Sequence, residues 1–328
     1  MSSETPPTTG NVHVCICACT YQRPRGLKDL LDGISALTFE RISTPAITVL
    51  IADNEASEVN EQICRDFHQF TSIPMIYVPV IERGISHARN ACLDQAPPQT
   101  DFIAFLDDDE IPEPTWLEQL LLIQTRTQGE VIFGPVLPSF TGHVPQWMRE
   151  GGFFATPRWH QELDEGQELN SAATGNCLLL KTMLRKSGLR FDNRLALSGG
   201  EDKLFFRQVR EQGYRIFWAP QARAIERVPP QRARFTYLLQ TEFRRGNLKL
   251  ITKLQLTRYA GSNWKKAKLL FKTLTRSITN IVSGSLIMVG SFLPWNRNKG
   301  RFYSGAFRVS EGLGMFTSLL GYRYSHYY

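Results

Sequence analysis

The sequence lacks the cysteine and histidine spacings that mark zinc or dithiol sites. It contains six cysteines in 328 residues, none in a Cys-x-x-Cys pair, and no Cys/His pattern with the spacing of zinc ligands. Cys15, Cys17 and Cys19 alternate along an apolar segment, so in a strand they share one face as small buried side chains. These absences exclude a zinc or disulfide scaffold and favour a reducing cytosol.

The N-terminus lacks the apolar core of a secretion signal. Residues 1–11 are rich in Ser, Thr and Pro. We expect them to form a disordered tail, and nothing in them indicates secretion.

Acidic residues are scarce in the last third of the chain. From Pro229 onward there are 17 Lys and Arg but only two acids, Glu242 and Glu311, a net charge of +15 that leaves −8 for the rest of a chain whose formal total is +7. A basic region can serve nucleic acid, anionic lipid or phosphorylated substrates. No nucleic-acid-binding motif accompanies it, so lipid and phosphate remain.

The preceding part alternates strand-like and helical segments. Strands are predicted over Val12–Cys19, Ile47–Ala52, Met75–Val80, 101–106, Val131–Phe133 and Ala173–Lys181, and helices over 24–37, Val59–Phe70, Ile85–Gln95, Trp116–Thr127 and Glu201–Glu211. This order predicts an α/β protein with a single, mostly parallel, Rossmann-like sheet and helices on both faces.

Three consecutive aspartates, Asp107 to Asp109, end one predicted strand. Adjacent buried carboxylates repel one another, and a hard divalent cation shared with a phosphate makes such a cluster tolerable. In open α/β sheets, ligands also bind at the carboxyl ends of strands. The cluster therefore indicates a metal–phosphate site, while a solvated turn that caps the helix after Pro114 is the alternative.

Other polar groups stand at similar positions. Asp53 ends the second strand and could accept hydrogen bonds from a nucleobase or form a turn with Asn54. Glu201 and Asp202 follow a glycine pair and begin a helix, so they are either capping acids or a general base on a hinged loop.

Taken together, the segments resemble the inverting family 2 glycosyltransferases, which have the GT-A fold. The matching segments follow the family's order over residues 12 to 230: Thr20-Tyr21-Gln22-Arg23-Pro24, Ala52-Asp53-Asn54, Gly84 to Asn90, Asp107-Asp108-Asp109, Gly175-Asn176 and Glu201-Asp202. Within the family, the chain is most similar to bacterial exopolysaccharide glucosyltransferases of the succinoglycan-assembly type. The resemblance implies a GT-A catalytic domain over 12–230 and leaves 231–328 as a basic, amphipathic helical region.

The resemblance also implies a UDP-sugar donor and a role for each matching residue. Thr20, Tyr21 and Arg23 would line the nucleotide pocket, Asp53 would receive the uracil, and Arg89 would position the nucleotide. Asp107 and Asp108 would contact the ribose and the donor sugar, and Asp109 would ligate Mn²⁺ or Mg²⁺. Asp202 would be the catalytic base, with Glu201 as the second choice, and Asn176 is a candidate acceptor-binding residue.

Two features depart from the family pattern or extend it. Many members have a downstream histidine, whereas this sequence offers Glu226 and Arg227 there. Arg244 and Arg245 are candidate diphosphate-binding residues, although a solvated or lipid-facing basic surface is equally consistent with them.

The C-terminal region indicates a membrane surface. Lys265, Lys266 and Lys268 precede an apolar stretch, Ile278–Trp295, which is at the short limit for spanning a bilayer. We expect an amphipathic or shallowly inserted segment, on a protein at the cytoplasmic face of the bacterial inner membrane. A buried helical hairpin in a soluble protein is the alternative.

The predicted function is metal-dependent, inverting transfer of glucose or a related hexose from a UDP-sugar to a lipid-linked or polysaccharide acceptor in exopolysaccharide synthesis. Four aromatic residues between Pro138 and Ser171 could stack on acceptor sugars or pack beneath a loop: Trp147, Phe153, Phe154 and Trp159. A sugar nucleotidylyltransferase is the alternative enzyme, but it would carry a glycine-rich loop after the first strand. The third candidate is a non-catalytic, membrane-bound partner that binds nucleotide sugars.

Overall fold

The computed structural model describes residues 12–142, 144–151, 163–256, 261–292 and 299–325. Within these ranges the chain forms two compact units. The first unit comprises residues up to 138 together with 156–196 and 201–226, and the second comprises 139–155, 197–200 and 227–328. The predicted tail, residues 1–11, lies outside the described residues.

The first unit is built on an eight-stranded sheet with the strand order β3-β2-β1-β4-β9-β6-β10-β8. Its strands are β1 (His13–Thr20), β2 (Ala46–Asp53), β3 (Met75–Pro79), β4 (Phe102–Asp107), β6 (Val131–Phe133), β8 (Glu168–Leu169), β9 (Cys177–Leu180) and β10 (Ile216–Trp218). A smaller sheet has the order β5-β11-β7, formed by β5 (Glu110–Pro112), β11 (Ala224–Val228) and β7 (Val136–Phe140).

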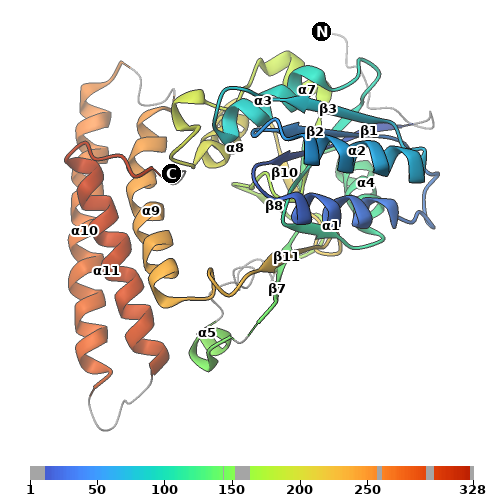
Figure 1. Cartoon of the computed structure of the whole chain (residues 1–328). Helices are drawn as coiled ribbons and strands as arrows, with labels where there is room; N and C mark the ends of the chain where they lie inside the picture. Colours follow the sequence, from blue (N-terminus) through green and yellow to red (C-terminus); the bar gives the residue numbers. More distant parts are fainter. Residues whose placement is uncertain (1–11, 143, 152–162, 257–260, 293–298, 326–328) are drawn as a thin grey trace. The chain divides into compact units, whose positions relative to one another are not determined.

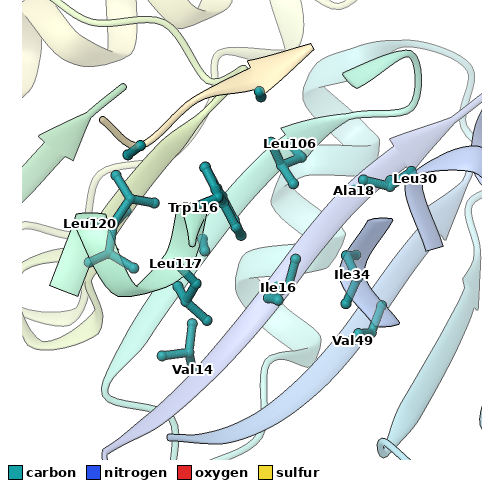
Figure 2. Packing of buried hydrophobic residues seen from close by; sticks show 14 of the residues in the cluster. Val14, Ile16, Ala18, Leu30, Ile34, Val49, Leu106, Trp116, Leu117 and Leu120 are labelled. Atoms are coloured by element: carbon teal, nitrogen blue, oxygen red, sulfur yellow. The ribbon is translucent and has the colours of Figure 1, made fainter. Parts of the chain in front are cut away.

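Helices cover both faces of the large sheet, as predicted. The helices of this unit are α1 (Pro24–Ser35), α2 (Glu58–Thr71), α3 (Ile85–Gln95), α4 (Trp116–Thr127), α7 (Lys181–Ser187) and α8 (Glu201–Glu211), with a 3₁₀ turn, η1, at Asn193–Leu195. Alternate residues of β1 point to opposite faces. Val14, Ile16 and Ala18 share a core with residues of α1, α2 and α4, and Figure 2 shows side chains of α1 and α4 beside them. Cys15 and Cys17 pack with α3, α7 and α8 on the other face.

The register of the parallel strands brings the polar strand ends together. Thr20 at the end of β1 pairs with Asp53 at the end of β2. On the other side of β1, Cys19 pairs with Asp107 at the end of β4. Residues far apart in the sequence therefore meet at one edge of the sheet, where ligands bind in this class of fold.

The sheet is less uniformly parallel than a simple strand–helix alternation suggests. Four of its pairings are parallel, but β9 runs antiparallel between β4 and β6, and β8 is antiparallel to β10. The strand predicted over Ala173–Lys181 is reduced to Cys177–Leu180, because Lys181 already begins α7.

The second unit contains three long helices: α9 (Phe235–Leu254), α10 (Asn263–Gly290) and α11 (Lys299–Leu319). Helix α11 packs against both α9 and α10 and lies between them (Figure 1). Gly246 and Gly314 allow α9 and α11 to approach closely, because a methyl group at either position would collide with the backbone of the other helix. A short helix, α5 (Gln146–Gly151), also belongs to this unit. Among the described residues, no helix combines the length and the apolar character needed to cross a bilayer.

Two phenylalanines on α2 offer a matched test of this core. Phe67 is 7% exposed in the core beneath α1 and α2, whereas Phe70 is 88% exposed. We expect Phe67→Ala to lower the free energy of unfolding by about 3–5 kcal/mol, because it removes buried apolar area and leaves a cavity. Phe70→Ala should change it by less than about 0.5 kcal/mol. Urea denaturation of both variants measures the difference, and equal effects would contradict the assigned packing of α2.

Candidate active site

The three aspartates lie where β4 turns into β5. Asp107 is the last residue of β4, and Asp108 is buried. The aspartates do not cap the following helix, because Thr115 is the N-cap residue of α4. The alternative of an acidic capping turn is therefore wrong. The acids are instead turned toward groups at the end of β1, the start of α1 and the middle of α3.

Asp108 is held by Thr20, the last residue of β1, and by Arg23, which precedes α1. Thr20 Oγ1 donates to Asp108 Oδ2 at 3.0 Å, and Arg23 Nη1 contacts Asp108 Oδ1 at 2.8 Å and Asp109 Oδ2 at 2.9 Å. Burial raises the pKa of Asp108 to about 6, and the charge of Arg23 opposes that rise. A methyl group at Gly26 would collide with the Asp108 carbonyl oxygen, so this glycine lets the first turn of α1 lie directly against the aspartates.

Arg89 joins the two acidic segments of the site. This buried guanidinium, on α3, pairs through Nη1 with Glu201 Oε1 and through Nη2 with Asp107 Oδ1 at 3.2 Å. Burial raises the pKa of the Glu201 carboxyl, while the charge of Arg89 counteracts it. The neighbouring carboxylates raise the pKa of Arg89 despite its burial, so it remains charged. The helix α8 is thereby tied to the end of β4.

Asp202 and Glu201 differ in accessibility. Glu201 is buried and engaged by Arg89, whereas Asp202 is partly exposed and its Oδ1 accepts a hydrogen bond from the Lys203 amide at 2.6 Å. Burial raises the pKa of both Asp107 and Glu201, and repulsion from the charge of Asp202 adds to that rise. Of the two predicted bases, Asp202 is the more exposed.

Glu110 also belongs to this site, although the sequence did not single it out. It is buried on β5, and its Oε2 accepts a hydrogen bond from the Asp107 amide at 2.9 Å. Burial, followed by repulsion from Asp107, raises its pKa well above the ordinary value. Its register partner on β11 is Glu226. A fourth acid directly after the three aspartates was the available signal.

The structure gives Asp53 a local role at the end of β2. It is fully buried, and its Oδ1 accepts a hydrogen bond from the Glu55 amide. Its Oδ2 accepts from the Ser57 amide, Asn60 Nδ2 and Tyr77 Oη at 2.7–3.0 Å. These bonds organise the β2–α2 turn, so a contact with uracil would require one of them to be exchanged. Nearby, the guanidinium of Arg83 lies 4.9 Å from the ring centre of Tyr21, a cation–π arrangement.

Asn176 is not available to an acceptor, and this prediction was wrong. The residue is fully buried in a left-handed conformation with φ 62°. Its side chain accepts from Trp116 Nε1 and donates to the carbonyl oxygens of Pro135 and Ala222. These bonds use both hydrogens of its amide and join α4 to two loops, so its role is structural.

The remaining candidates lie in the second unit or outside the described residues. Trp147 stacks on Tyr303 with ring centres 4.0 Å apart and meets Phe235 edge-on, as part of a small apolar core. Arg244 and Arg245 are on α9, and Arg245 pairs with Glu242. Phe153, Phe154 and Trp159 fall outside the described residues.

The site is rich in carboxyl groups. Six gather in it, and Arg23 and Arg89 are among the cations paired with them: Asp107, Asp108, Asp109, Glu110, Glu201 and Asp202. Carboxylate oxygens are the ligands that Mg²⁺ and Mn²⁺ prefer, so the donor chemistry fits such an ion. No group of three or more acidic, His or Cys side chains in the described part of the chain is already arranged to hold a metal. A bound ion would therefore need further oxygens from phosphate or water.

Comparison with known proteins places this geometry in a family. The sequence pattern of glycosyl transferase family 2 matches residues 15–188, from β1 to the end of α7. The chain belongs to this family. The match spans Asp107 to Glu110 and the ends of β1, β2 and β4, and it ends before Glu201 and Asp202; the fold is GT-A.

Two curated relatives cover most of the chain. The succinoglycan biosynthesis protein ExoM of Rhizobium meliloti is 34% identical over 236 residues, which are 72% of this chain and 73% of that protein. The glucosyl-dolichyl phosphate glucuronosyltransferase of Haloferax volcanii is 21% identical over 250 residues, 74% of this chain and 77% of that protein.

Solved structures support the fold at low identity. The mannosyltransferase PcManGT from Pyrobaculum calidifontis, in complex with GDP-Man and Mn²⁺, has a TM-score of 0.56 at 14% identity and covers 94% of this chain and 88% of its own. TarS 1–349 from S. aureus, in complex with UDP-GlcNAc, has a TM-score of 0.53 at 13% identity and covers 92% of this chain and 90% of its own.

Adjacent acids provide a test of the Arg89 pairing. We expect Glu201→Ala to lower the free energy of unfolding by about 3 kcal/mol or more, because it leaves a buried guanidinium with only Asp107 as its partner. Asp202→Ala should cost less than about 1 kcal/mol, since Asp202 is partly exposed and contributes mainly at the helix N-terminus. Chemical denaturation compares the two, and a larger loss for Asp202→Ala would contradict the assignment.

Proposed function

We propose that the protein is an inverting glycosyltransferase that moves a hexose from a UDP-sugar to an acceptor hydroxyl, with Asp202 as the general base. The observation that carries the proposal is the pairing of Arg89 with Glu201 and Asp107, which holds a partly exposed acid beside the aspartate cluster. Family membership supplies the reaction class.

The chemistry requires a base because a sugar hydroxyl is a poor nucleophile at neutral pH. Asp202 would accept the hydroxyl proton as the oxygen attacks the anomeric carbon. Attack from the side opposite the leaving diphosphate inverts that carbon. Glu201 would position Arg89 and Asp202 rather than accept the proton, because its carboxylate is buried and engaged.

The leaving nucleoside diphosphate gains negative charge, which cationic groups must stabilise. Asp109, together with Asp107, would hold Mn²⁺ or Mg²⁺, an ion that neutralises diphosphate charge when bound. Thr20 and Arg23 hold the turn that carries these acids, and Tyr21 with Arg83 offers a ring and a guanidinium to the nucleotide. The Mn²⁺ bound with GDP-Man in PcManGT and the UDP-GlcNAc bound to TarS support the same ligand classes here.

The similarity to ExoM supports a role in exopolysaccharide synthesis. We propose glucose or a related hexose as the transferred sugar and a lipid-linked or polysaccharide acceptor. Work on such an acceptor would take place at the cytoplasmic face of the bacterial inner membrane. Arg244 and Arg245 stay predicted contacts for the diphosphate.

The base assignment is tested by Asp202→Asn. The amide keeps the shape but cannot accept the proton, so we expect transfer to fall by about 10³-fold while UDP-sugar affinity changes by less than about threefold. UDP release and calorimetric binding measure the two effects. Asp66→Asn, an exposed substitution on α2, is the control and should retain activity. Retained turnover in Asp202→Asn would remove Asp202 from this role.

The metal assignment is tested by Asp109→Ala. Removing this carboxylate should weaken Mn²⁺-dependent UDP binding by about tenfold or more, with little change in binding measured in EDTA. Asp66→Ala is the matched control. If Mn²⁺ enhances UDP binding equally in Asp109→Ala and in the unchanged protein, Asp109 does not hold the ion.

A further inference from the structure

Helix α10 buries several small or polar side chains and exposes large apolar ones. The buried residues of α10 are Leu269, Thr273, Ser277 and Gly284, and Ser277 and Gly284 lie against α11. Ser277 Oγ donates to the Gly312 carbonyl oxygen at 2.8 Å, and Asn280 Nδ2 donates to Glu311 Oε2 at 3.0 Å. Small and polar groups therefore take part in the contact between the two helices, beside apolar ones.

Large apolar side chains cover the outer face of the same helix. Six of them recur at intervals of three, four or seven residues and are each 51–79% exposed: Trp264, Phe271, Ile278, Val282, Leu286 and Val289. This spacing places them in one row along the helix. A helix that exposes a row of large apolar side chains is adapted to an apolar surrounding medium.

A basic row runs beside the first half of the apolar row. Lys265, Lys268, Lys272 and Arg276 are exposed and follow one another at intervals of three or four residues. Helix α10 contains no Asp or Glu from Asn263 to Gly290. An apolar row flanked by cations matches a bilayer whose headgroups are anionic.

We propose that this outer face of α10 docks on an anionic lipid bilayer, with the helix axis along the membrane surface. The apolar row enters the boundary between headgroups and acyl chains, and the basic row contacts the headgroups. Docking would bring the enzyme to a lipid-linked acceptor, and only this link rests on the proposed function. Vesicle binding requires neither transfer nor a bound donor.

The first test measures binding of the full-length protein to vesicles. We expect it to float with vesicles of phosphatidylglycerol and phosphatidylcholine at low salt, and to be released by high salt or on phosphatidylcholine alone. Asp202→Asn should float equally well, which separates docking from catalysis. Failure to bind anionic vesicles at low salt would overturn the proposal.

Two double variants locate the docking face. Lys268→Ala/Lys272→Ala should weaken vesicle binding by about 25-fold, at roughly fivefold per cation near the surface. Lys28→Ala/Arg65→Ala removes the same charge from exposed positions on α1 and α2 and should leave binding unchanged. Equal losses in the two variants would mean that net charge, rather than this face, governs binding, and the proposal would fail.

The apolar row is tested with Val282→Glu/Leu286→Glu, which should reduce binding by about tenfold or more. Its control, Val59→Glu/Phe70→Glu, introduces the same charges on exposed apolar positions of α2. Circular dichroism checks that both remain folded. If Val282→Glu/Leu286→Glu keeps vesicle binding but converts a dimer to a monomer in light scattering, a second copy covers the face and the proposal is wrong.

Discussion

The arrangement of the site depends on one buried cation. The Arg89 guanidinium contacts Asp107 from the end of β4 and Glu201 from the start of α8, residues 94 positions apart in the sequence. Without a charge between them, two acids that burial already disfavours would repel each other. The ion pairs hold the start of α8 at the sheet edge and thereby determine where Asp202 stands. Because Glu201 is engaged in the pairing, we assign the proposed base role to its neighbour, Asp202.

Sequence patterns predicted the first half of the fold closely, because each element there has a local signal. The predicted bounds of α3 and α4 match the structure, and Thr20, Asp53 and Asp107 end adjacent strands as expected. Strand β9 was harder, since a short apolar run carries no information about direction. Its antiparallel pairing depends on residues more than 40 positions away.

Side-chain roles were less predictable than positions. Asn176 stands in a family motif, but a motif does not show which way an amide points, and here it satisfies buried backbone groups. Asp53 similarly serves the turn that follows its own strand. The sequence does not distinguish Glu110 from the three acids before it. In the structure its carboxylate has a separate role, because it accepts a hydrogen bond from the backbone amide of Asp107. Burial and partners decide such roles, and both arise only from the tertiary structure.

The opposite net charges of the residues up to 228 and of the residues after them can be explained by what each part would bind. Residues up to 228 carry −8, and an acidic site of this kind would by itself repel an anionic nucleotide sugar. A cation bound at the site reduces that repulsion locally, and the +15 of the remaining residues makes the whole molecule positive. The same excess of Lys and Arg would draw the protein to anionic lipid. Placing four of these cations beside the exposed apolar row of α10 converts a general attraction into a defined docking surface.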